Sequence, residues 1–144
     1  MSIRVREAVE ADIPQIADVA SASFTPATDP IARNLFPNHD LNAAIPEGEA
    51  AVAWRRSRKT LKLHSPDAIL MVAVDNALDG RVVGFSLWEP PLGDAPETKE
   101  PLLTCEGLDL KAFQEMKDVV NNTVDKQFGK RGLRDLWYKF GFVM

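Results

Sequence analysis

The sequence predicts an α+β fold, a three-layer arrangement in which a mixed, mostly antiparallel sheet of about four strands has helices on both faces. Residues 68–74 form an apolar run of strand length, which predicts a central strand. About six turn residues separate this run from a second one at 81–88, so we expect the two to pair as an antiparallel hairpin. Apolar stripes at helical spacing lie on either side of the hairpin, within 13–24 and 113–124. Strands bracketed by helices in this way are typical of a layered α+β domain.

The first 25 or so residues are expected to form a strand and a helix. Residues 3–7 alternate apolar and polar side chains, which indicates a half-buried strand. Glu10, Asp12 and Pro14 favour a helix start, and Pro26 favours its end. The side chains that share the apolar face of this helix are Ile13, Ile16, Ala17, Ala20 and Phe24.

The middle of the chain predicts two more helices. Asp29 and Pro30 have the residue types of an N-cap and a first helical position, so a short helix should run to Leu35. A longer helix is expected from Glu47, and its second half carries five cations. They are Arg55, Arg56, Arg58, Lys59 and Lys62. We favour the interpretation that they are solvated and complement the helix dipole, while the alternative is a binding patch for an anion or phosphate.

The last part of the chain predicts a loop, a helix and a strand. The segment 92–107 is rich in Pro, Gly and charged residues and indicates a loop. Asp109 is a suitable N-cap for a long helix, and Gly129 is a suitable C-cap. The final stretch, residues 134–144, is aromatic and branched and predicts a strand.

Composition narrows the class of protein. The chain has 144 residues, 45% of them hydrophobic and 26% charged, which suits a single globular domain over 1–144. Its net charge of -4 argues against nucleic-acid binding, which requires a basic field. It contains no apolar run long enough to span a membrane and only one cysteine, Cys105. We therefore expect a cytoplasmic protein that binds neither nucleic acid nor membrane.

Several kinds of site are not indicated by the sequence. His39 and His64 are too far from paired cysteines or acids to suggest a metal site, so none is predicted. Cys105 has no histidine near it in sequence, which favours a neutral thiol over a nucleophile. The three tryptophans are expected to be core anchors rather than a stacking platform. They are Trp54, Trp88 and Trp137.

Three stretches resemble a known family. Residues 3–17 are similar to the opening strand and helix of the GNAT superfamily of N-acetyltransferases, specifically its small fungal-type members. Residues 82–91 are similar to the third strand of that family, and 136–144 to the start of its fourth. The order of the expected elements also agrees. The resemblance implies acetyl transfer from acetyl-CoA to a small-molecule or peptide amine.

The family's fourth strand leads into a Gly-rich loop at a helix N-terminus, where backbone N–H groups hold the pyrophosphate of acetyl-CoA. The nearest match here is 126–132, where Arg131 stands in place of a small residue and a strand follows instead of a helix. We therefore interpret this stretch as a turn. The expectation is a GNAT-like domain truncated before the cofactor loop, with weak acetyl-CoA binding or none.

The resemblance also implies roles for particular residues. The main chain of Phe142, Val143 and Met144 would lie near the acetyl and pantetheine end of the cofactor. Phe24 and Trp88 would line the acceptor side. Glu89 ends a strand that faces the expected cleft and is the candidate general base, while the alternative is a turn residue before Pro90.

A second hypothesis belongs to a different class of function. The apolar final strand offers an edge for strand addition. The chain could then be a non-catalytic GNAT-like domain that forms a homodimer, or binds a partner, through this strand.

Overall fold

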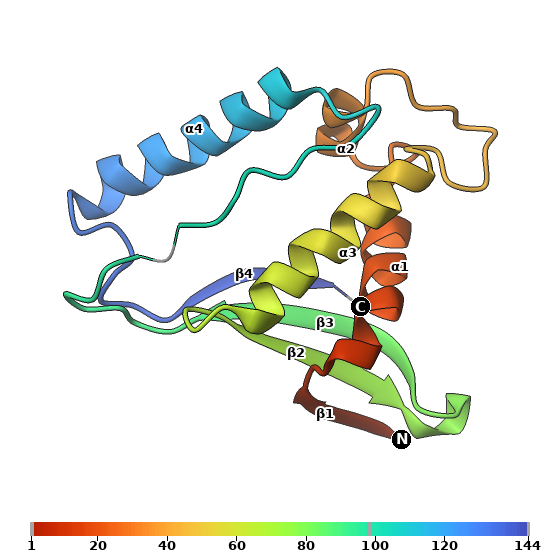
Figure 1. Ribbon diagram of the computed structural model, residues 1–144, viewed down its shortest axis with the longest axis horizontal. Helices are drawn as coiled ribbons and strands as arrows, with labels where there is room; N and C mark the ends of the chain where they lie inside the picture. The colour runs from red at the N-terminus through yellow and green to blue at the C-terminus, as the bar shows by residue number, and fades with distance from the viewer. Residues whose placement is uncertain (1, 98, 144) are drawn as a thin grey trace.

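A computed structural model of the protein describes residues 2–97 and 99–143, with the side chains of 138–143 outside the description. Figure 1 shows the helices gathered above a twisted sheet. The strands are β1 (Ile3–Glu7), β2 (Ile69–Asp75), β3 (Arg81–Glu89) and β4 (Tyr138–Val143). The helices are α1 (Ile13–Ser23), α2 (Pro30–Leu35), α3 (Glu49–His64) and α4 (Leu110–Phe128), with short 3-10 turns η1 (Glu10–Asp12) and η2 (Asn76–Leu78).

The four strands form one sheet in the order β1-β2-β3-β4, and every pair is antiparallel. The predicted hairpin is β2 and β3, in which Val72 pairs with Phe85. β1 and β4 are therefore the two edges of the described sheet. The predicted α+β fold class is confirmed.

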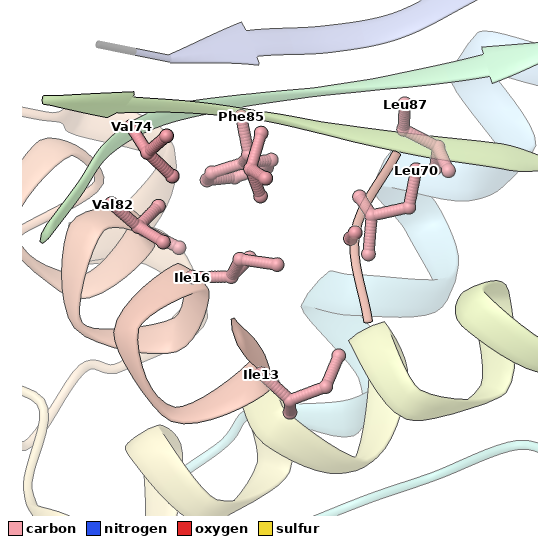
Figure 2. Close-up of a cluster of buried hydrophobic side chains, with 10 residues drawn as sticks. Ile13, Ile16, Leu70, Val74, Val82, Phe85 and Leu87 are labelled. Atoms are coloured by element: carbon pink, nitrogen blue, oxygen red, sulfur yellow. The ribbon is translucent and has the colours of Figure 1, made fainter. Parts of the chain in front are cut away.

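The main hydrophobic core lies between the sheet and α1. Figure 2 shows Val74, Val82 and Phe85 on the strands pointing toward Ile16 of α1. Ile16 is fully buried, and Leu63 of α3 packs against the same cluster. Burying a side chain of this size contributes about 1.5–3 kcal/mol to folding.

The helices that pack on the sheet cover one face, which differs from the predicted coverage of both faces. Leu70, Val72 and Val74 are buried beneath the helices, whereas the alternate residues of β2 are half-buried. On that other face Val5 of β1 is 63% exposed. No helix of the described chain lies there, because α1, α3 and α4 are all on the same side (Figure 1). Alternating burial of this kind is the mark of a sheet with one covered face.

The helix caps agree with the sequence prediction. The Asp29 side chain accepts a hydrogen bond of 3.0 Å from the Ile31 N–H at the start of α2. The Asp109 side chain accepts one of 3.0 Å from the Ala112 N–H at the start of α4. Gly129 caps the end of α4 with a φ of 72°, a conformation that a side chain disfavours.

β4 begins at Tyr138, four residues later than predicted. Residues 130–136 form turns and a bend instead, because Arg134 is tied to the preceding loop. Its carbonyl accepts hydrogen bonds from the Leu92 and Gly93 N–H groups, and its guanidinium donates to the Gly93 carbonyl. Trp137, just before the strand, is 62% exposed and is not the core anchor that was predicted.

The apolar stripe of α4 is buried only in its first turns. Phe113 is 5% exposed, but Val120 is 43% and Phe128 is 51% exposed. The predicted helix is confirmed, while its second half packs against little of the described chain.

Candidate functional site

A cavity of about 500 Å³ lies between the helices and β3. We call it the Lys59 cavity. It is lined by Ala20, Ser23, Phe24, Thr28, Asp29, Pro30, Ile31, Ala32, Leu35, Phe36, Trp54, Arg55, Arg58, Lys59, Phe85, Phe113 and Met116. The volume is within the usual range of small-molecule sites.

Three aromatic side chains form one wall of this cavity. Trp54 meets Phe36 edge to face with ring centroids 6.1 Å apart, and it meets Phe113 in the same way at 5.5 Å. The Trp54 Nε1–H donates a 3.0 Å hydrogen bond to the Leu103 carbonyl. Trp54 is thus the core anchor that the sequence predicted, and it fixes α3 against α4 and the preceding loop. Such edge-to-face pairs add about 0.5–1.5 kcal/mol each beyond burial.

Two cations of α3 reach the cavity without a direct ion pair among the described residues, although the charge of Glu100 acts on Arg58. The Arg58 guanidinium carbon lies 4.8 Å from the Trp54 ring centroid and 5.3 Å from that of Phe113. The Lys59 Nζ lies 4.8 Å from the Phe85 ring centroid. Within the described part of the chain, neither side chain makes a hydrogen bond or an ion pair. Burial lowers the pKa of both side chains, so the favoured interpretation, in which the cations of this helix are solvated, is wrong for these two residues. It is also wrong for Arg55 and Lys62, which are paired with carboxylates, whereas Arg56 is exposed.

The electrostatics of Lys59 follow from its surroundings. Burial is the main cause that lowers its pKa, to about 8. The neighbouring cations Arg58, Arg55 and Lys62 lower the pKa further. A lysine that borders a cavity and whose pKa is lowered by desolvation and by neighbouring charges is a candidate functional residue.

Arg55 lines the same cavity but is paired with a buried carboxylate, that of Glu47. Its Nε lies 4.0 Å from Glu47, whose side chain is 1% exposed. Its terminal NH2 group donates a 3.1 Å hydrogen bond to the Phe24 carbonyl. Because neither Glu47 carboxylate oxygen has a hydrogen-bond partner, the charge of Arg55 is what compensates this buried acid.

The end of β4 lies next to the cavity. Val143 pairs with Phe85, which lines the cavity, and Phe142 pairs with Ser86. Farther along, Lys139 pairs with Trp88, so the register shifts by one residue. Leu87 therefore faces two residues of β4, Phe140 and Gly141, which is the arrangement of a β-bulge. A bulge leaves one residue outside the ladder and its peptide group available to a ligand.

Among the predicted site residues, Phe24 lies at the Lys59 cavity. It is 39% exposed and lines the Lys59 cavity, which the end of β4 borders through Phe85. The backbones of Phe142 and Val143 are described, whereas Met144 lies outside the described residues. The cofactor-binding roles of Phe142, Val143 and Met144 remain predictions.

Trp88 lies away from this cavity. Its Nε1–H donates a 3.0 Å hydrogen bond to the hydroxyl of Ser86, two residues earlier in β3. Phe85 and Leu87 face the helices, so by alternation Ser86 and Trp88 point to the other face of the sheet. The acceptor-side role predicted for Trp88 therefore involves a different face from that of Phe24.

Glu89 lies in a second cavity of about 460 Å³, which we call the Lys62 cleft. Its carboxylate is 3.2 Å from the Lys62 Nζ, which also contacts Glu100 at 2.6 Å. Burial lowers the pKa of Lys62, but the hydrogen bond to Glu100 and the charges of both acids outweigh this and raise the pKa overall. The predicted base is thus the counter-ion of a lysine, and it does not line the cavity that contains Phe24.

Metal binding and a phosphate cradle are not supported by the described residues. No group of three or more His, Cys, Asp or Glu side chains in them could hold a metal ion. His64 instead pairs with Glu10 at 2.8 Å on the surface. Burial raises the pKa of the Cys105 thiol, in agreement with a neutral cysteine. The Gly-rich stretch 126–132 is the end of α4 and a turn, as interpreted from the sequence.

Sequence reasoning missed Gly141, and it included Arg58 and Lys59 only in the less favoured alternative of an anion-binding patch. A glycine inside an apolar strand is a recognised sign of a bulge and could have indicated Gly141. Nothing in the sequence distinguished Arg58 and Lys59 from the other cations of α3, because their neighbours in the cavity come from α2, β3 and α4.

Comparison with known proteins finds similarity to a solved structure. No family model matches the chain, and no curated protein matches it. The solved structure is described as histone acetyltransferase HPA2 and related acetyltransferase from Corynebacterium glutamicum. It is 23% identical with a TM-score of 0.41, and the match covers 88% of this chain and 72% of that chain. Identity and TM-score at this level do not establish the family of the chain. Among the described helices, none is long and apolar enough to cross a membrane.

Proposed function

We propose that this protein is an N-acetyltransferase-like domain whose family reaction transfers an acetyl group from acetyl-CoA to an amine. The observation that carries the proposal is the position of Phe85. It pairs with Val143 at the end of β4 and also lines the cavity that contains Phe24. The strand end expected to hold the acetyl group is therefore paired with a residue that lines the same cavity as Phe24.

The residues present fit one end of acetyl-CoA. β4 is an edge strand, so its outer N–H and C=O groups can pair with the amides of a pantetheine arm as an added strand would. The bulge opposite Leu87 offers a peptide N–H for an acetyl carbonyl oxygen. The residues described here contain no loop that would hold the pyrophosphate, so the fit covers the acetyl and pantetheine end.

When bound, acetyl-CoA would supply a thioester-activated acetyl group. The chain would contribute position, because the Lys59 cavity holds an acceptor beside the end of β4. Backbone N–H groups of β4 would stabilise the negative charge that develops on the carbonyl oxygen. Glu89 remains our proposed proton acceptor, and it would act from the Lys62 cleft, which shares Arg58 with the Lys59 cavity.

The proposal is tested by calorimetric titration with acetyl-CoA at two protein concentrations, with mass-spectrometric detection of acetylated amines. We expect weak, saturable binding, with a dissociation constant on the order of 1 mM, since pyrophosphate contacts are missing. Gly141→Val should abolish binding by removing the bulge. Phe24→Ala should leave acetyl-CoA affinity unchanged while lowering acetylation. A folded protein that neither binds acetyl-CoA nor yields product at millimolar concentrations would overturn the proposal.

The role of Glu89 has a matched control, because Glu100 pairs with the same lysine. Each replacement by Gln removes one ion pair of Lys62. Glu89→Gln should lower acetylation by about 100-fold or more, the usual contribution of a general base, whereas Glu100→Gln should not. Equal losses of acetylation in both variants would show that Glu89 acts only as a counter-ion of Lys62.

The edge position of β4 also favours a second candidate function, a non-catalytic domain that pairs with another copy or a partner through this strand. This candidate predicts a concentration-dependent dimer in sedimentation experiments, which Phe142→Lys should dissociate. A wild-type monomer at every concentration, with an unaffected variant, would count against it. Competition between acetyl-CoA and dimer formation would show that both use the same edge.

A further inference from the structure

The Lys59 cavity contains more positive charge than its own acids compensate. Of its three cations, Arg55 is adjacent to Glu47, whereas Arg58 and Lys59 have aromatic rings as their near contacts. The charge of Glu100 acts on Arg58, but the Glu100 carboxylate is already paired with Lys62. The acid that lines the cavity is Asp29. One of its carboxylate oxygens already accepts a hydrogen bond from the Ile31 N–H as the N-cap of α2. Two cations are therefore available to an anion that enters the cavity.

The remaining walls are mostly apolar. Phe24 and Ile31 are 39% and 56% exposed, so they present accessible surface. Trp54 and Phe113 close the cavity behind Arg58. A ligand that covers these surfaces therefore needs an apolar group in addition to its anionic group.

We propose that the Lys59 cavity binds an acceptor that carries a carboxylate and an apolar side chain, as an α-amino acid such as phenylalanine does, with Arg58 and Lys59 holding the carboxylate. The inference rests on the proposed function in taking this ligand to be the amine that is acetylated. It adds the substrate class that the proposed function leaves open.

A carboxylate suits this cavity better than a phosphate group. The planar Arg58 fork can donate two parallel hydrogen bonds to a carboxylate, and Lys59 adds a point charge. A phosphate carries more charge and more acceptor oxygens, while the other side-chain hydroxyls that line the cavity are those of Ser23 and Thr28. The apolar walls would leave a phosphate poorly solvated.

The test compares L-phenylalanine with 2-phenylethylamine, two amines that differ only in the carboxylate. Calorimetry on the wild-type protein should show at least tenfold tighter binding of L-phenylalanine. Equal affinity, tighter binding of 2-phenylethylamine, or no binding of L-phenylalanine would each overturn the proposal. Inorganic phosphate should not displace L-phenylalanine at equal concentration, and displacement would indicate a general anion site instead.

Three variants assign the effect to residues. Arg58→Gln and Lys59→Gln should each reduce the preference for L-phenylalanine by about tenfold. Lys62→Gln is the matched control on the same helix, because Lys62 already has two carboxylates and should leave the preference unchanged. If Lys62→Gln reduced the preference for L-phenylalanine while Arg58→Gln and Lys59→Gln did not, the assignment would be overturned. Circular dichroism melts confirm that each variant is folded.

Failure of this inference is distinguishable from failure of the proposed function. Binding of L-phenylalanine without acetyl-CoA binding or acetylated product would support the carboxylate site and contradict acetyl transfer. Binding of acetyl-CoA with acetylation of 2-phenylethylamine in preference to L-phenylalanine would support acetyl transfer and overturn the carboxylate site.

Discussion

Two lysines one turn apart on α3 lie in opposite environments. Lys62 contacts two carboxylates, Glu89 at 3.2 Å and Glu100 at 2.6 Å, and its pKa is raised overall. Lys59 lies over the Phe85 ring and borders a largely apolar cavity, and its pKa is lowered to about 8. Buried charge that already has its counter-ions serves the fold, whereas buried charge without them reduces stability and is available to a ligand. The comparison therefore separates a structural cation from a candidate binding cation on one helix.

The largest expected effect comes from the aromatic wall behind Arg58. Trp54→Ala removes a side chain that is 4% exposed, together with its hydrogen bond to the Leu103 carbonyl. We expect a loss of about 3–5 kcal/mol in the free energy of unfolding, as for other buried aromatic truncations. Urea denaturation measures the change. Trp137→Ala is the control, since Trp137 is 62% exposed and its removal should cost less than about 0.5 kcal/mol. Similar losses in the two variants would mean that Trp54 does not anchor the cavity.

Replacement of each lysine by methionine should change stability in opposite directions. Lys59→Met removes a desolvated charge that lacks a counter-ion and should raise the free energy of unfolding by about 1 kcal/mol. Lys62→Met leaves Glu89 and Glu100 without their partner and should lower it by about 1 kcal/mol. Urea denaturation at pH 7 compares both variants with the wild type. A loss of stability in Lys59→Met equal to that in Lys62→Met would contradict the comparison.

The lowered pKa of Lys59 also predicts a dependence on pH. The unfolded chain keeps a lysine pKa near 10.5, so between about 8 and 10.5 it binds more protons than the folded chain. Stability should therefore rise with pH across this window, by on the order of 1–2 kcal/mol. The difference between the wild type and Lys59→Met isolates this contribution, because other titrating groups are common to both. A constant difference from pH 7 to pH 10 would show that Lys59 has an ordinary pKa.

Local sequence patterns predicted most of the fold. The caps at Asp29, Asp109 and Gly129, together with the hairpin, depend on residues close in the chain, and the structure confirms them. The start of β4 was misplaced because the hydrogen bonds of Arg134 connect it to Gly93 and Leu92, about 40 residues away in sequence.

The candidate site was predicted less well, for a related physical reason. Arg58, Lys59 and Lys62 look alike in sequence, and only the tertiary contacts distinguish them. The partners of Lys62 come from the end of β3 and from the following loop, and the ring beneath Lys59 belongs to β3. Phe24 lines the Lys59 cavity, but its acceptor-side role came from the family resemblance and stays a prediction.

The most direct measurement is an amide NMR titration of the isotope-labelled protein with acetyl-CoA. The two sheet edges provide an internal comparison, because β1 and β4 are both edges of the described sheet but only β4 pairs with Phe85, which lines the Lys59 cavity. We expect saturable shifts in the amides of residues 139–143 and of Phe85, with no change in β1. Shifts of equal size along both edges, or none at millimolar acetyl-CoA, would contradict it.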